Sequence, residues 1–66
     1  MELIINGELR ITPEMTSLAD LAAWLDLPTF GSAIELNSTV IRKALYSETP
    51  VNSGDRLEIV RLVGGG

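Results

Sequence analysis

The sequence predicts an α+β fold in which a mixed sheet of four or five strands packs on one main helix. Alternating apolar and polar residues over 8–12, and the apolar run over 57–63, are typical of strands. Residues 18–25 instead repeat their apolar side chains with the spacing of a helix. The order strand, strand, helix, strand, irregular stretch, strand is that of a roll whose sheet wraps around the helix.

The first two strands are expected at residues 2–6 and 8–12, joined at Asn6-Gly7. Asn-Gly between two β-rich runs is the strongest short-range sign of a hairpin, because a type I′ turn needs φ > 0 at both central residues. In the second strand Leu9 and Ile11 alternate with polar residues, so we expect them to face the core. Turn geometry accounts for Asn6 and Gly7 without a ligand.

The main helix is expected to follow Pro13, with Ser17 as its N-cap and Asp20 completing a capping box. The apolar residues at 18, 21, 22 and 25 form one stripe that must lie on the sheet, and the sequence at 26–28 ends the helix. Trp24, off this stripe, is interpreted as a cover over the rim of the core. Phe30 in the next loop is expected to plug the helix end.

A third strand is expected at 33–37, with 40–41 as a candidate extension after a break at 38–39. The stretch around Tyr46 and Pro50 shows no sustained period and suggests a short helical turn and a short edge strand. The turn at 52–55 leads into the last strand, 56–62, which is apolar on both faces because Val60 and Leu62 alternate with Leu57 and Ile59. Such a strand is central in the sheet or has an exposed apolar end that needs a partner.

Length and composition exclude several kinds of function. The 66 residues make one domain, and a domain of this size buries only about 60% of its unfolded surface, so a large active-site cleft does not fit. Without Cys or His the chain has no thiolate metal site and no thiol nucleophile, and we predict no metal site. The net charge of −4 disfavours nucleic acid and anionic membranes and suits a basic protein partner. With no signal peptide or membrane span in the sequence, we expect a cytoplasmic protein.

The chain ends in Val63-Gly64-Gly65-Gly66. Glycines add no side chain to a core and lose the most entropy on ordering, so we expect a domain over 1–62 and a flexible tail over 63–66. Fully extended, the four tail residues reach at most roughly 14 Å. Gly66 then offers one ionised carboxylate whose carbonyl carbon is unhindered. A merely frayed terminus is the alternative.

A roll of this kind with a glycine tail is a β-grasp fold, and the chain resembles the ubiquitin-like sulfur carriers, most closely the ThiS family. The resemblance rests on Asn6, the strand at 33–37, the Gly54-Asp55 turn, the strand at 58–61 and the terminal Gly65-Gly66. It covers the whole chain. The segment at 40–46 departs from the family pattern, which leaves partner contacts there undefined.

The resemblance implies that a ThiF-like adenylyltransferase uses ATP to adenylate the Gly66 carboxylate. A sulfur donor such as a cysteine desulfurase persulfide then makes a thiocarboxylate, whose sulfur passes to a ThiG-like thiazole synthase in thiamine biosynthesis. The chain itself would bind no cofactor, would be monomeric when free, and would act as a covalent co-substrate rather than an enzyme. By position, the partner contacts are expected at five residues, with ordinary core packing as the alternative for the apolar three: Val60, Leu62, Val63, Gly64 and Gly65.

Other classes share these features. The small subunit of molybdopterin synthase (MoaD) and carriers for tRNA or amino-acid thiolation have the same fold and tail, although MoaD-type chains usually run longer. A plain interaction domain or a protein modifier would use the glycines as a tether or for conjugation and carry no sulfur. Deleting Gly66 separates these classes, because a carrier loses all function and keeps its fold.

Overall fold

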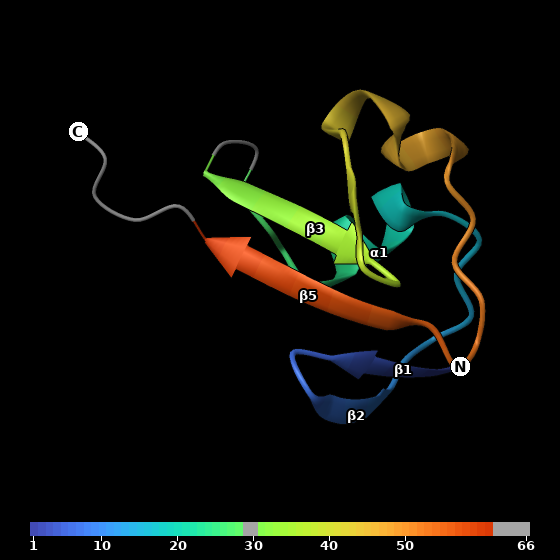
Figure 1. The fold of residues 1–66 in the computed structure, drawn as a ribbon. Coiled ribbons are helices and arrows are strands. Elements are labelled where there is room, and N and C mark those ends of the chain that lie inside the picture. Colours follow the sequence, from blue (N-terminus) through green and yellow to red (C-terminus); the bar gives the residue numbers. More distant parts are fainter. Residues whose placement is uncertain (29–30, 62–66) are drawn as a thin grey trace.

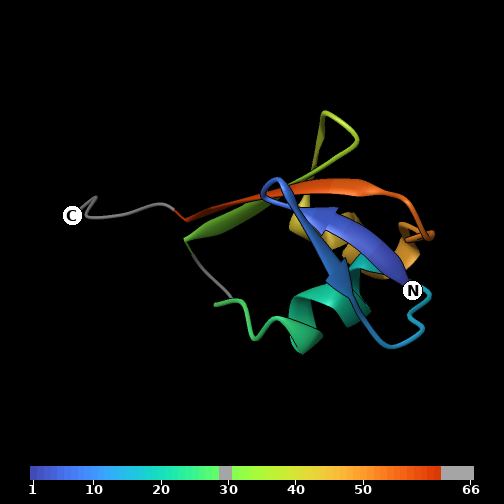
Figure 2. The same ribbon diagram turned by 90° about the horizontal axis from the view of Figure 1, so that it is seen from below.

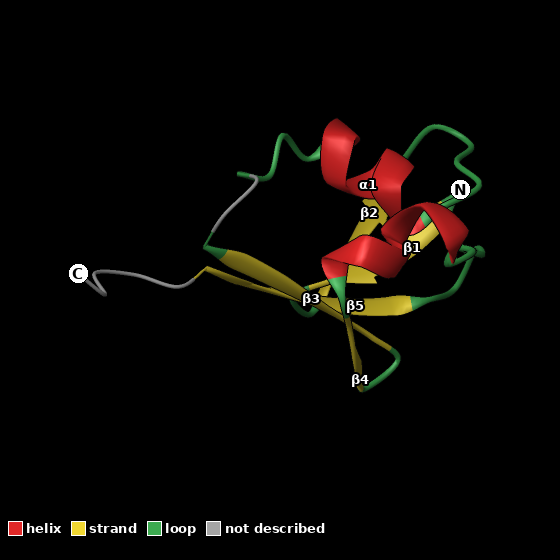
Figure 3. Cartoon of the chain, turned by 90° about the horizontal axis from the view of Figure 1, so that it is seen from above, coloured by secondary structure: helices red, strands yellow, loops and turns green. Residues whose placement is uncertain are grey.

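The computed structural model describes residues 1–28 and 31–61, which form a five-stranded mixed sheet in the order β2-β1-β5-β3-β4. Figures 1, 2 and 3 show both helical segments on one face of this sheet, and we call the other side the open face. This arrangement confirms the predicted roll, with the last strand inside the sheet. The elements are β1 (Glu2–Ile5), β2 (Glu8–Ile11), α1 (Leu18–Trp24), β3 (Ser32–Leu36), β4 (Thr39–Ile41), the 3₁₀ helix η1 (Lys43–Glu48) and β5 (Arg56–Arg61).

The β1-β2 hairpin turns at the predicted pair. Asn6 has φ 51° and Gly7 has φ 82°, and Ile5 lies opposite Glu8, so the loop has two residues. Both backbone angles are positive, as a type I′ turn requires. The prediction of this hairpin is confirmed.

The side on which the apolar residues of β2 lie was predicted wrongly. Leu9 and Ile11 are 63% and 70% exposed. Residues opposite each other in neighbouring strands share a face, and Arg10 lies opposite the fully buried Leu3. Arg10 therefore faces the helix, with its guanidinium 5.5 Å from the centre of the Trp24 ring, while Leu9 and Ile11 lie on the open face.

The helix and its cap form as predicted. The Ser17 hydroxyl accepts from the Asp20 amide at 3.2 Å, and an Asp20 carboxylate oxygen accepts from the Ser17 amide at 3.2 Å, which closes the capping box. Leu18 and Leu21 are fully buried against the sheet, whereas Trp24 is 39% exposed at the rim. The buried apolar core consists of Leu3, Ile5, Leu18, Leu21, Ile34, Tyr46, Val51 and Leu57.

The chain after β3 turns back instead of continuing. Leu36 pairs with Thr39 in an antiparallel hairpin, because Asn37 and Ser38 both adopt positive φ, 48° and 76°. The expected extension of the third strand is therefore a separate edge strand, β4. The short helical turn around Tyr46 is confirmed as η1, but the expected edge strand after it is reduced to one bridge between Pro50 and Ser17. The role expected for Phe30 falls outside the described residues.

Candidate functional site

The central strand β5 leads toward the C-terminus, and its end defines the candidate site. β5 pairs in parallel with β1 only at its start, where Ile4 and Ile5 lie opposite Arg56 and Leu57. Its antiparallel pairing with β3 continues to its end, where Arg61 lies opposite Ser32 (Figure 1). The predicted site residues beyond this point lie outside the described residues: Leu62, Val63, Gly64, Gly65 and Gly66.

Asn6 carries the contact between β1 and β5 past the end of their backbone pairing. Its amide N–H donates to the Leu57 carbonyl oxygen at 2.9 Å, and its side-chain Oδ1 accepts from the Ile59 N–H at 2.7 Å. The positive φ of Asn6 directs the side chain to this position, and Asn tolerates that angle better than most residues. Sequence reasoning assigned Asn6 to the turn alone. It missed the second role, which depends on a partner 53 positions away.

A second set of polar contacts fixes the start of β5. The Asn37 side chain accepts from the Arg56 N–H at 3.0 Å and donates to the Asp55 carboxylate at 3.1 Å. The same carboxylate accepts from the Asn52 N–H at 2.8 Å, and the N–H of Gly54, at φ 93°, donates to the Glu2 carbonyl at 2.6 Å. The Gly54-Asp55 turn that supported the resemblance therefore positions the strand that precedes the tail.

The open face beside the end of β5 combines apolar and acidic side chains. Val60, the one predicted contact residue that the structure describes, is 44% exposed and lies opposite Ala33 of β3. Two residues earlier in β5, and on the same face, Glu58 lies opposite Glu35 of β3. Glu35 in turn lies opposite the exposed Val40 of β4. Two like charges directly opposite each other are unfavourable in an isolated sheet. This part of the open face is thus suited to a partner with apolar and basic groups.

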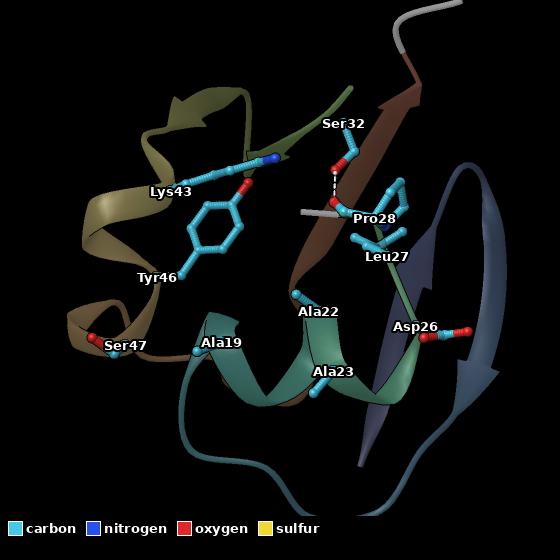
Figure 4. A pocket seen from close by; sticks show the side chains of 10 residues that line it. All are labelled: Ala19, Ala22, Ala23, Asp26, Leu27, Pro28, Ser32, Lys43, Tyr46 and Ser47. Atoms are coloured by element: carbon cyan, nitrogen blue, oxygen red, sulfur yellow. Dashed lines mark hydrogen bonds between the residues drawn. The ribbon is translucent and has the colours of Figure 1, made fainter. Parts of the chain in front are cut away.

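A pocket of about 350 Å³ lies between α1 and η1 (Figure 4). Its helix wall consists of the small residues Ala19, Ala22 and Ala23, and the hydroxyl of Ser32 on its rim donates to the Pro28 carbonyl at 3.1 Å. Burial raises the pKa of the Tyr46 phenol above its usual value, so this group stays neutral near pH 7. Asp26 and Lys43 line opposite ends of the pocket (Figure 4) and do not form an acid–base pair within it.

Two further properties concern the described residues as a whole. Within ranges 1–28 and 31–61 no three His, Cys, Asp or Glu side chains are grouped so that they could hold a metal ion. The same part of the chain contains no helix that is long and apolar enough to cross a membrane.

Fold and strand end together define a ubiquitin-like β-grasp protein whose central strand runs toward a glycine-rich C-terminus. A profile of the ThiS family matches residues 3–66, and the chain belongs to this family. It is 38% identical over 66 residues to a thiazole synthase of Paramagnetospirillum magneticum, a match that covers all of this chain and 20% of that protein. It is 42% identical over 62 residues to the uncharacterized protein ycf40 of Porphyra purpurea, which covers 94% of this chain and 87% of the relative.

Solved structures agree with the family assignment. The crystal structure of the thiamine biosynthesis protein ThiS from Geobacter metallireducens is 28% identical, superposes with a TM-score of 0.82 and is matched over 100% of both chains. The solution structure of a thiamine biosynthesis protein from the same organism gives a TM-score of 0.81 at 28% identity, covering 100% of this chain and 88% of that one. Membership of this family supports a role as a sulfur carrier.

Proposed function

We propose that the chain carries sulfur on its C-terminus for the thiazole step of thiamine biosynthesis. A ThiF-like enzyme uses ATP to adenylate the Gly66 carboxylate, with release of pyrophosphate. The terminal sulfur of a donor persulfide, such as that of a cysteine desulfurase, attacks the activated carbonyl carbon, and AMP leaves. A thiol then cleaves the remaining S–S bond and frees the thiocarboxylate. A ThiG-like thiazole synthase accepts this sulfur.

Family membership is the observation that carries the proposal, and the chemistry of the terminus agrees with it. A carboxylate is a very poor electrophile until it carries a good leaving group, and attack by a persulfide needs open space around the carbonyl carbon. The last three residues are glycines without Cβ atoms. Five residues separate the last described one, Arg61, from the end of the chain, and when extended they reach at most roughly 17 Å into a partner's cleft.

The acceptor is assigned from one relative. A protein named thiazole synthase contains a segment that is 38% identical to this chain over all 66 residues. Fusion to a thiazole synthase is what a dedicated sulfur carrier for that enzyme would gain from, because tethering raises the effective concentration of the two partners. The match favours thiazole formation over the transfer of sulfur to molybdopterin or to tRNA.

The experiment that tests the proposal is the intact mass of the protein after incubation with a ThiF-like enzyme, ATP and a persulfide donor. We expect a mass gain equal to the exchange of one oxygen for sulfur, dependent on ATP and absent from a variant that lacks Gly66. The same variant should unfold at the temperature of the parent protein. No gain, with an activating enzyme shown to bind the chain, would contradict sulfur loading and favour an interaction module or a conjugated modifier.

We propose that these partners dock on the open face around Val60 and also contact Leu62 and Val63, which follow it in the sequence. Val60→Asp should lower the rate of adenylation on the order of tenfold, because a partner would then desolvate a charge against an apolar contact. Val60 is 44% exposed, so the fold should tolerate the change. Leu9→Asp is the matched control, being 63% exposed on the same face but on the outer strand. Equal adenylation rates for both variants would move the docking surface elsewhere.

A further inference from the structure

The outer edge of β2 is a surface to which the proposed function assigns no role. β2 stands first in the strand order, so among the described strands only β1 pairs with it. All four of its residues are exposed. A strand edge of this kind presents unpaired N–H and C=O groups that can pair with another strand.

The hairpin register determines which backbone groups point outward. In a two-residue hairpin the residues that flank the turn, Ile5 and Glu8, exchange both of their hydrogen bonds, and bonded and non-bonded pairs then alternate. The bond from the Thr12 N–H to the Met1 carbonyl, at 2.8 Å, fits this alternation. Glu8 and Arg10 therefore direct their backbone groups toward β1, and Leu9 and Ile11 direct theirs to the free edge.

The sequence of this edge is complementary to itself in one antiparallel register. When Leu9 of one copy lies opposite Leu9 of a second copy, the two leucines exchange both of their outward backbone hydrogen bonds, and each Ile11 lies beside the Asn6-Gly7 turn of the other copy. Glu8 then lies opposite Arg10 of the second copy, and Arg10 opposite its Glu8, at the closer non-bonded positions. A shift of two residues in either direction sets Arg10 against Arg10 or Glu8 against Glu8. Charge thus selects a single register.

The side chains on both faces of β2 favour this pairing. On the helix side, the Arg10 guanidinium is held 5.5 Å from the centre of the Trp24 ring, which limits its freedom before any partner arrives. On the open face, Leu9 and Ile11 are 63% and 70% exposed, and a second copy would place its own Leu9 beside the first. Pairing therefore combines backbone bonds, two opposite-charge pairs and apolar contact.

We propose that two copies of the chain associate through antiparallel β2 strands and join their sheets into one. The contact involves a strand of four residues and is smaller than the ~1,000 Å² of a stable interface, so we expect a dissociation constant on the order of 1 mM. The chain is then monomeric when dilute, which agrees with what the family resemblance implies, and dimeric when concentrated. The hairpin turn and the end of β5 lie at the same end of the sheet (Figure 1), so the two β5 strands of the dimer point in opposite directions.

Amide NMR spectra of the ¹⁵N-labelled protein, recorded with translational diffusion between about 50 μM and about 2 mM, test the pairing. The amide signals of Gly7, Leu9 and Ile11 should shift with concentration while diffusion slows. An absence of shifts at these amides up to the highest concentration would overturn the proposal. So would shifts that map instead to Val60 and Val40.

Charge exchange provides the sharper test. Glu8→Arg and Arg10→Glu each place like charges opposite each other, and each should weaken association on the order of tenfold. The double variant should regain it, and an equimolar mixture of the two single variants should associate more strongly than either alone. A mixture no stronger than its components would overturn the register. Glu8→Arg leaves Arg10 and Trp24 in place, so its effect on association tests the register even when Arg10→Glu disturbs the fold.

Discussion

Replacing Asn6 by glycine removes the acceptor for the Ile59 N–H and leaves the turn free to keep its positive φ. A hydrogen bond of this kind contributes about 1 kcal/mol net, and glycine adds up to about 0.5 kcal/mol of extra unfolded-state entropy. We therefore expect Asn6→Gly to lower the free energy of unfolding by about 1–1.5 kcal/mol. Asn6→Ala loses the same bond and also forces alanine to a φ near 51°, for a total of about 2–3 kcal/mol.

Asn6→Asp is the matched control, because a carboxylate keeps the acceptor and tolerates the same backbone angle. It should stay within about 0.5 kcal/mol of the parent protein. Urea unfolding measures all three variants, and hydrogen exchange locates the effect: in the glycine and alanine variants Ile59 should lose more protection than Leu21 in the helix, which should lose only what the change in global stability accounts for. Unchanged protection at Ile59, or an aspartate variant as unstable as the glycine variant, would refute the role given to the Asn6 side chain.

Three further predictions concern the core and the helix cap. Leu57→Ala, at a fully buried position, should lower the free energy of unfolding in urea by about 2–5 kcal/mol. Leu9→Ala, at 63% exposure, should lower it by less than about 0.5 kcal/mol. Similar losses for the two variants would contradict the position of Leu9 on the open face. Ser17→Ala should lower the free energy of unfolding by about 1 kcal/mol, because it removes the side-chain acceptor at the N-cap. The α-helical signal in thermal unfolding should be smaller where the capping box is lost before the rest of the fold. The Thr16 backbone amide holds the pKa of Asp20 below its usual 3.8, so the ionised Asp20 side chain stabilises the fold above that pH, and this stabilisation is lost as the pH falls. Asp20→Asn should therefore flatten this part of the acid unfolding curve. An unchanged curve would contradict the stabilising role of the Asp20 carboxylate.

The elements that the sequence predicted well are those defined by neighbouring residues. The Asn6-Gly7 turn needs two positive φ angles, and few other pairs supply them so readily. The capping box is likewise closed by Ser17 and Asp20, three positions apart. The central place of β5 followed from apolar residues on both of its faces. In each case the information lies within one strand or one helical turn.

The predictions that were wrong concern residues whose position is determined by an element far away in the sequence. Alternation in β2 showed that Leu9 and Ile11 share one face, but which face is set by Leu3 and Ile5 filling the core from β1. The return of the chain at Asn37-Ser38 was missed because the serine there adopts a φ of 76°, which its residue type does not indicate. Asn37 is held by Asp55 and Arg56, and that contact exists only after β3 and β5 have paired.

The same distinction between local sequence and distant contacts applies to the candidate site. The proposed reactive group is the carboxylate of Gly66, which the sequence and the family resemblance indicate without any structure. The proposed docking surface depends on register, since Val60 lies on the open face only because Leu57 is buried against the helix and side chains alternate along the strand. The polar contacts of Asn6 and Asn37 hold that register from both sides of β5. A slip of one residue would turn Val60 toward the helix and Ile59 outward. Asn6→Ala should therefore weaken docking as well as stability, and adenylation by a ThiF-like enzyme well below the unfolding temperature measures that loss separately.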